Sequence, residues 1–320
     1  MHTSEIQIAK LYLVNEDVVA IPTETVYGLA ANIYSEKAVQ KIYHLKKRPK
    51  SSPLIVHVDS IAQCEALVNA IPDPIYTLMA HFWPGPLTVL LPKNDSVPEW
   101  VTGESPFVGI RMPNHALTLD LIRECGFPLA APSANPFSKI SPTTAQMVDH
   151  YFKEDAVFVL NGGPCSSGLE STIVGFENNQ VKVYRLGALS LEAITAVVGD
   201  VLYEGKPDKV FFTPGRFPKH YAPNTPVVLT EDLESTLTLY GEDTTQRIAV
   251  LSYFPIQNLP ENCQLFLWEI NENWEAVAQQ LYATLFSIDR MQFDVMLIQK
   301  FPEEGLGKTI NDRLNRASIQ

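Results

Sequence analysis

The chain lacks the cysteine and histidine patterns of metal-binding and redox proteins. Its 320 residues include only four cysteines, which are far apart: Cys64, Cys125, Cys165 and Cys263. There is no CxxC pair and no HExxH pattern, which argues against a zinc ribbon, a dithiol redox motif and a zincin. We therefore expect reduced thiols and no protein metal cage, so that any metal ion would arrive with a phosphate-bearing ligand.

Long apolar stretches are also missing. No run of 18 apolar residues occurs, so no membrane-spanning helix is expected. The first residues, Met1 to Glu5, lack the basic-then-apolar layout of a signal peptide. The sequence therefore predicts a cytoplasmic protein.

Basic side chains are fewer than acidic ones. The net charge is −12 and the pI is about 5.0, which argues against a protein that coats nucleic acid through a broad basic face. Residues 221–320 hold 14 acidic and 6 basic side chains, whereas residues 1–220 hold 22 and 18. We expect any local positive site in the first segment and an acidic accessory domain in the second.

The hydrophobic pattern alternates between helical and extended periods, which predicts an α/β fold. In the first part, helices are expected over 4–14, 35–47, 75–82, 116–123, 143–151 and 191–198, and strands over 18–21, 54–58, 87–91, 107–111, 128–131, 156–160, 171–174 and 181–184. In the last part, strands are expected over 227–229, 248–251 and 295–298, and helices over 231–239, 274–288 and 306–317. Between them the chain is rich in proline, typical of an extended strap. We predict a domain over 1–200, a linker or lid over 201–224 and a domain over 225–320.

A cluster of cations follows one predicted helix, in Lys46-Lys47-Arg48-Pro49-Lys50. Arginine binds phosphate through two N–H groups and lysine binds it as a point charge. The dipole at a helix C-terminus also favours cations. The sequence leaves both interpretations open.

Small and polar residues form turns after three predicted strands, at Thr23–Leu29, Ala131–Pro136 and Asn161–Pro164. Ligands of open α/β sheets bind at the carboxyl ends of strands, and glycine there lets backbone amides approach a phosphate. Ordinary turns use the same residue types, so each turn alone is weak evidence for a site.

Taken together, nine motifs in order resemble one family over nearly the whole chain. They are Thr23–Leu29, Lys46–Pro49 with Pro53–His57, Trp83–Thr88, Gly109–Pro113, Ala131–Asn135, Ser141–Thr143, Ser171–Val174, Arg185–Ala188 and His220–Pro223. The family is the YrdC-like L-threonylcarbamoyladenylate synthases, in their longer form. The resemblance implies a YrdC-like twisted open sheet domain and a smaller C-terminal Rossmann-like α/β domain, joined by a Pro-rich linker.

The resemblance also implies a reaction. L-Threonine and bicarbonate or CO2 form a carbamate, whose carboxylate attacks the α-phosphate of ATP, with Mg2+, to give threonylcarbamoyl-AMP and pyrophosphate. The enzyme would be a nucleotidyltransferase. Its product would supply a tRNA-modification transferase complex that forms threonylcarbamoyladenosine at position 37 of tRNA.

Site residues follow from the resemblance, residue by residue. Lys46 and Arg48 would be catalytic, holding phosphates. The threonine pocket would be lined by Thr25, His57, Arg111, Ala131 and Ser171, with Arg111 on the threonine carboxylate. ATP would be contacted by Arg48, Ser52, Ser133, Asn135, Ser141, Arg185 and Tyr221, and the strap that carries Tyr221 would close as a lid.

Two alternatives remain from the sequence. The first is an RNA-binding or translation-associated protein of the same fold, in which the cations at 46–50 meet an RNA backbone; weak RNA binding would also be compatible with the synthase. The second is a carbamoyl-transfer enzyme for another acceptor, although the zinc-finger segments expected of one are absent.

Overall fold

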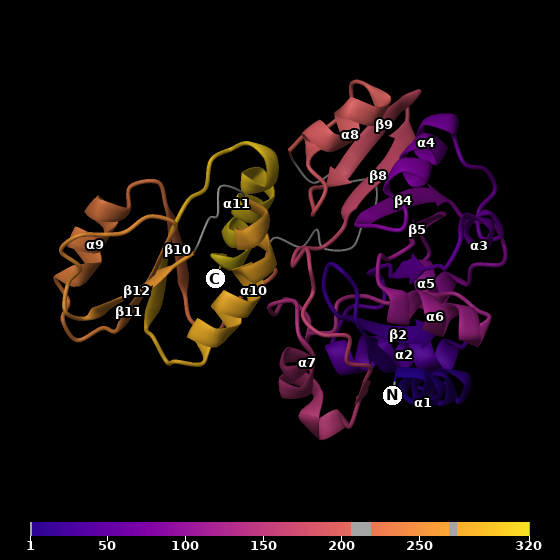
Figure 1. Ribbon diagram of the computed structural model, residues 1–320, viewed down its shortest axis with the longest axis horizontal. Helices are drawn as coiled ribbons and strands as arrows, with labels where there is room; N and C mark the ends of the chain where they lie inside the picture. Colours follow the sequence, from indigo (N-terminus) through magenta and orange to yellow (C-terminus); the bar gives the residue numbers. More distant parts are fainter. Residues whose placement is uncertain (1, 206–218, 269–273, 320) are drawn as a thin grey trace. The chain divides into compact units, whose positions relative to one another are not determined.

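The computed structural model describes residues 2–205, 219–268 and 274–319 (Figure 1). The chain divides into two compact units. The first unit comprises Met1–Phe137 and Ser141–Arg216, and the second comprises Ser138–Ile140 and Phe217–Gln320. Of the predicted linker over 201–224, residues 206–218 lie outside the described part.

The first unit holds nine strands and eight α-helices among its described residues. The strands are β1 (Val19–Ile21), β2 (Gly28–Asn32), β3 (Ile55–His57), β4 (Leu87–Pro92), β5 (Phe107–Arg111), β6 (Leu129–Ala130), β7 (Phe158–Val159), β8 (Thr172–Glu177) and β9 (Gln180–Arg185). The helices are α1 (His2–Val14), α2 (Glu36–Lys46), α3 (Ile61–Glu65), α4 (Asp73–Phe82), α5 (Glu99–Thr102), α6 (Ala116–Cys125), α7 (Ala145–Phe152) and α8 (Leu191–Val198), with a 3-10 turn, η1, at Lys153–Asp155.

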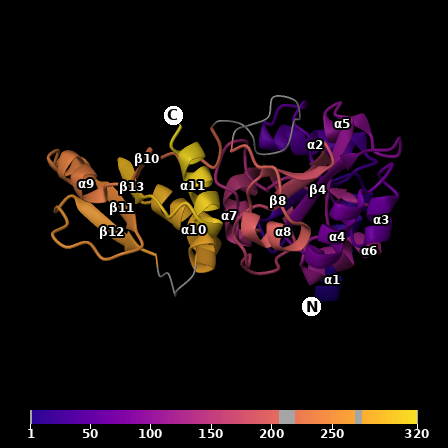
Figure 2. The ribbon, with the colours of Figure 1, turned by 90° about the horizontal axis from the view of Figure 1, so that it is seen from above.

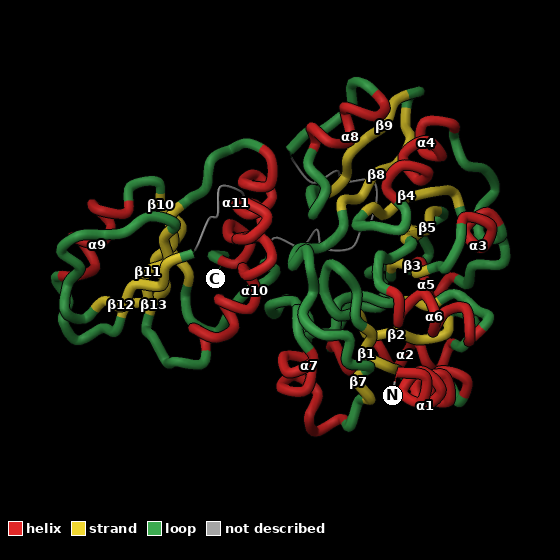
Figure 3. Tube along the Cα trace, viewed as in Figure 1, coloured by secondary structure: helices red, strands yellow, loops and turns green. Residues whose placement is uncertain are grey.

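The strands form one mixed sheet in the order β7-β1-β2-β6-β3-β5-β4-β8-β9. Three pairs are parallel (β1 with β7, β3 with β5, β4 with β8) and the others are antiparallel. The strand order also places strands that are far apart in sequence next to one another, as the tube in Figure 3 shows.

Alternation of side chains along the strands builds a core on each face of this sheet. On one face Val56 and Ala130 join the larger core with side chains of α2 and α4. On the other face Leu129 packs with Ile6 of α1 and Leu121 of α6. The two helix layers therefore fix the sheet from both sides in the region of β1, β2 and β6.

The second unit is a smaller three-layer sandwich. Its parallel sheet has the order β10-β13-β11-β12. These strands and the flanking helices are β10 (Val227–Thr230), α9 (Leu233–Gly241), β11 (Ile248–Ser252), β12 (Cys263–Leu267), α10 (Trp274–Asp289), β13 (Val295–Gln299) and α11 (Gly305–Ala317). Figure 2 shows α9 on one side of this sheet and α10 with α11 on the other. The apolar strands β11 and β13 are buried throughout, as expected for parallel strands covered on both faces.

The predicted α/β class and its two sheet-containing parts are confirmed. Helix α2 begins as expected, with the Ser35 side chain accepting from the Ala38 amide at 3.2 Å. Two strands were missed. Strand β2 consists of small residues of low strand propensity and is held by pairing with β1 and β6, and β12 is a half-exposed strand at an edge of the second sheet.

No helix within the described residues is long and apolar enough to cross a membrane.

Candidate functional site

Two of the motif turns are held together by main-chain hydrogen bonds. Strand β2 continues the turn after β1, and its Leu29 amide donates to the Pro132 carbonyl at 2.8 Å, while the Ala134 amide donates to the Tyr27 carbonyl at 2.7 Å. The contact is close, because a Cβ placed on Gly28 would lie 3.1 Å from the Cβ of Ala131. Main-chain hydrogen bonds therefore join the Thr23–Leu29 and Ala131–Asn135 motifs into one packed unit.

Strand register gathers polar side chains from four strand ends onto one face of the sheet. His57, the last residue of β3, pairs with Arg111, the last residue of β5. Thr88 of β4 and Ser171, just before β8, bring their hydroxyl oxygens to 2.7 Å. The same face carries a small apolar cluster of Ile55, Leu90 and Ile173. Because β4 runs antiparallel to β5 and parallel to β8, the carboxyl ends of β3 and β5 lie beside the amino ends of β4 and β8, and these residues come together.

Arg111 is the centre of the buried polar cluster, with a side chain only 5% exposed. Its Nη1 donates to Thr25 Oγ1 at 2.7 Å and its Nε donates to the Gly85 carbonyl at 3.2 Å. Its Nη2 lies 2.6 Å from Glu24 Oε2, in an ion pair between two buried groups. The guanidinium is therefore fixed in plane before any ligand arrives, which favours recognition of a planar anion such as a carboxylate.

His57 is neutral at physiological pH. Burial, reinforced by the charge of Arg111, lowers the pKa of its ring to about 3, and only a backbone hydrogen bond at Ile55 acts in the opposite sense. Its Nδ1 is buried and has no hydrogen-bond partner among the described residues. His57 therefore offers the cluster a neutral imidazole with one unused nitrogen.

A pH effect on stability follows from His57. Because the folded pKa lies below the value of an unfolded histidine, its contribution is present above pH 6.5 and is lost as the pH falls towards 3. Between pH 6.5 and 5 the free energy of unfolding should fall by about 2 kcal/mol through this group. Urea unfolding at pH 7.5 and 5.0 would measure the fall, which His57→Gln should reduce; an equal fall in both proteins would contradict the assignment.

Arg185 of β9 holds the chain before β8. Its Nη2 donates to the Ser171 carbonyl at 2.7 Å and lies 3.2 Å from Ser171 Oγ, and Nε donates to the same carbonyl at 3.2 Å. Both residues are buried. Ser171, predicted for threonine, and Arg185, predicted for ATP, are thus brought together by the structure.

Lys46, the last residue of α2, is buried and binds two carbonyl oxygens of a neighbouring loop. It is 1% exposed, and its Nζ donates to the carbonyl oxygens of Ser133 at 2.5 Å and Asn135 at 2.6 Å. Burial, together with the charge of Arg48, holds the pKa of Lys46 well below its usual value. Two hydrogen bonds from Nζ therefore fasten the Ala131–Asn135 loop to the end of α2.

The other cations of residues 46–50 differ in burial. Arg48 is 8% exposed and donates to the Pro53 carbonyl at 3.0 Å, whereas Lys47 and Lys50 are exposed. Burial therefore alternates along the residues that follow α2, which ends at Lys46 with Lys47 as a left-handed C-cap. The buried half of the cluster binds the carbonyls of Ser133, Asn135 and Pro53, and the exposed half faces solvent.

The remaining predicted nucleotide residues also lie in the first unit, apart from Tyr221. Ser52, Asn135 and Ser141 are buried, and Ser141 donates to Glu170 Oε1 at 2.7 Å. Tyr221 belongs to the second unit, where its ring stacks on Tyr282 at 5.6 Å. Its predicted contact with ATP stays a prediction.

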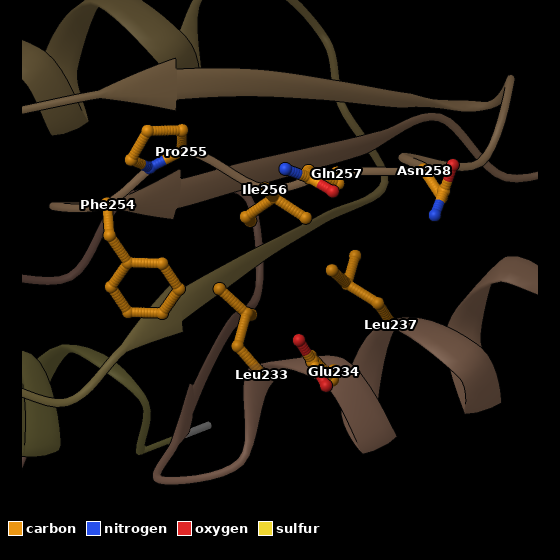
Figure 4. A pocket seen from close by; sticks show the side chains of 8 residues that line it. All are labelled: Leu233, Glu234, Leu237, Phe254, Pro255, Ile256, Gln257 and Asn258. Carbon is orange, nitrogen blue, oxygen red and sulfur yellow. The ribbon is translucent and has the colours of Figure 1, made fainter.

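Two surface hollows lie outside this cluster. One, of 380 Å³, is in the second unit between α9 and the segment after β11 (Figure 4); it is lined by Leu233, Glu234, Leu237, Phe254, Pro255, Ile256, Gln257 and Asn258. The other, of 610 Å³, is in the first unit and is lined by residues 114–117 and 161–163. No group of three or more acidic, histidine or cysteine side chains suited to a metal occurs among the described residues.

The sequence matches two family profiles in tandem. Residues 12–187 match the Sua5, YciO and YrdC family described as "Telomere recombination", and residues 189–318 match "Threonylcarbamoyl-AMP synthase, C-terminal domain". The chain belongs to the threonylcarbamoyl-AMP synthase family. The resemblance drawn from nine motifs is confirmed.

Full-length relatives of the family share both parts. The threonylcarbamoyl-AMP synthase of Bacillus subtilis is 37% identical, over 99% of this chain and 94% of its own. That of Schizosaccharomyces pombe is 33% identical, over 94% of this chain and 84% of its own. The crystal structure of Pyrococcus abyssi Sua5 complexed with L-threonine superposes with a TM-score of 0.90 at 35% identity, covering 98% of this chain and 94% of that one.

Three buried partners escaped the analysis of the sequence. Glu24 pairs with Arg111, Glu170 accepts from Ser141, and Thr88 contacts Ser171. Glu24 and Thr88 lie inside motifs that were recognised. For Glu24, the available signal was an acidic residue in an otherwise neutral motif at the end of a strand. Which arginine or serine each would meet depended on the strand register.

Proposed function

We propose that this chain is a threonylcarbamoyl-AMP synthase, a nucleotidyltransferase that makes threonylcarbamoyl-AMP and pyrophosphate from L-threonine, bicarbonate or CO2, and ATP. The observation that carries the proposal is the buried cluster around Arg111, in a chain that matches full-length members of the family. A fixed guanidinium beside a neutral histidine suits a small amino-acid carboxylate. The P. abyssi relative was solved with L-threonine.

The two substrates would contact different residues of the site. Arg111, Thr25, His57, Ala131 and Ser171 would line the threonine pocket. The loop fastened by Lys46, with Arg48, Ser52, Ser133, Asn135, Ser141, Arg185 and Tyr221, would hold ATP. Both sets except Tyr221 belong to the first unit. Holding both reactants in one frame would convert a bimolecular attack on the α-phosphate into an intramolecular one.

Mg2+ fits this site as a companion of ATP. A magnesium ion usually keeps several waters and takes one or two carboxylates plus substrate phosphates. Glu170, buried beside Ser141, is the carboxylate nearest the predicted nucleotide residues in the hydrogen-bond network. When bound with ATP, the ion would neutralise charge on the triphosphate, while Lys46 and Arg48 would orient the phosphates.

The partners of the reaction remain proposals. A tRNA-modification transferase complex would accept the product, and a cytoplasmic location fits the four free cysteines. The rival RNA-binding function is disfavoured, because Lys46 and Arg48 are buried and only Lys47 and Lys50 of that cluster reach solvent. Weak RNA binding by other surfaces stays a prediction.

Pyrophosphate release tests the function directly. Purified protein with ATP, Mg2+ and bicarbonate should release pyrophosphate only when L-threonine is added, and the release should require bicarbonate. L-Serine is the matched control, since a contact with the missing methyl contributes about 1–3 kcal/mol. Folded protein that releases none with any amino acid would refute the synthase.

A further inference from the structure

The first unit holds a group of buried polar atoms whose hydrogen-bonding capacity is unused. Both carboxylate oxygens of Glu24, Nη2 of Arg111 and Nδ1 of His57 are buried without a hydrogen bond among the described residues. Glu24 and Arg111 approach to 2.6 Å as an ion pair, with no hydrogen bond assigned to these atoms among the described residues. Buried polar atoms in native proteins nearly always have partners, so this group marks a ligand site.

The charges of the group identify the chemistry of that ligand. Arg111 presents donors and a positive charge, and Glu24 beside it presents two acceptors and a negative charge. An amino acid at neutral pH is a zwitterion with its carboxylate and ammonium on the same carbon. Its carboxylate on Arg111 therefore brings its ammonium towards Glu24. Each end of the ligand would give hydrogen bonds to atoms that have none among the described residues.

The reaction requires the ammonium to lose a proton, because a protonated amine has no lone pair with which to attack carbon. We propose that Glu24 is the general base that accepts this proton from bound threonine. The inference rests on the proposed function and assigns a role to a residue that the family resemblance left without one. Geometry supports the role: the carboxylate is buried, 5% exposed, and held next to the residue predicted to bind the threonine carboxylate.

The step balances with bicarbonate as the carbon source. The ammonium gives one proton to the Glu24 carboxylate. The freed amine then forms a C–N bond with bicarbonate carbon, the C–OH bond breaks, and hydroxide leaves as water with the second amine proton. The products are the carbamate, water and protonated Glu24, which returns its proton to solvent before the next cycle.

Other groups face Glu24 but suit the role less well. His57 has a ring pKa lowered to about 3, so it is a weak base. His115, at the start of α6, and Cys165 both feel the charge of Glu24, yet burial lowers the pKa of His115 and raises that of Cys165 to about 12. Arg111 is a cation and cannot accept a proton. Glu24 is the one anionic acceptor among these groups, and neither of its carboxylate oxygens accepts a hydrogen bond among the described residues.

Glu24→Gln with a pH series tests the proposal. The variant keeps the size of the side chain and removes the base, so kcat/KM for threonine at pH 7 should fall about 100-fold or more. As the pH rises to about 9.5, threonine with a free amine becomes abundant, and the gap between the variant and the wild type should shrink at least tenfold. The ratio of activities at the two pH values in one sample reports on the chemistry when the folded fraction is the same at both, which circular dichroism checks.

Matched variants separate catalysis from structure. Glu24→Asp should recover part of the activity at pH 7. Glu170→Gln makes the same change at another buried glutamate, and its loss should not be relieved by alkali. Activity of Glu24→Gln equal to wild type, a loss that is constant with pH, or equal alkaline relief in Glu170→Gln would overturn the proposal. Wild-type protein without threonine- and bicarbonate-dependent release would instead overturn the proposed function, and the inference with it.

Discussion

Replacing Arg111 with alanine should lower kcat/KM for threonine about 100-fold or more, with KM rising most. Removing one partner of a buried charge pair costs about 2–5 kcal/mol in binding. Arg111 donates to Thr25 and Gly85 and pairs with Glu24, so its loss removes a positioned cation from the buried cluster. Steady-state pyrophosphate release at varied threonine, with saturating ATP, measures the effect.

The same substitution also leaves Glu24 buried and unpaired, which would destabilise the fold by about 3–5 kcal/mol. A double variant, Arg111→Met with Glu24→Gln, removes both charges and should regain most of the thermal stability. Its kcat/KM for threonine should stay as low as that of Arg111→Ala. If the double variant recovered both, or if Arg111→Ala kept its threonine KM, the role of Arg111 in binding the carboxylate would be refuted.

Lys46→Met should reduce kcat/KM for ATP by about 100-fold. The change keeps an unbranched side chain of similar size but leaves the carbonyls of Ser133 and Asn135 without their buried donor, at a cost of about 1–3 kcal/mol for each unsatisfied group. It also removes the cation predicted to hold phosphate. Pyrophosphate release at varied ATP, with threonine and bicarbonate saturating, measures the loss.

Lys50→Met is the matched control. It removes the same charge from the same cluster, but Lys50 is exposed and should change activity less than about twofold. Full activity in Lys46→Met would show that the cations at 46–50 merely complement the dipole of α2. An equal loss in both variants would indicate a general electrostatic effect rather than a specific phosphate contact.

Much of the fold follows from local pattern. The Ser35 cap, the helical spacing of α2 and the apolar runs of β11 and β13 are set by residues close in sequence, and all were predicted. Strand β2 was not, because its small residues have no preference of their own for an extended chain. Its position comes from pairing with β1 and β6, which only the assembled sheet provides.

The functional site, like the fold, followed in part from the sequence and in part from the tertiary structure. The residue types and the order of the motifs were enough to name the family, and they placed Arg111, His57 and Ser171 at strand ends. The sequence alone determined an acidic, two-part α/β chain with the motifs of one enzyme family. Only the tertiary structure decided that Lys46 is buried on two carbonyls and that Glu24 faces Arg111. Those contacts join residues more than 80 positions apart, and they arise from strand register, which no local property of the sequence encodes.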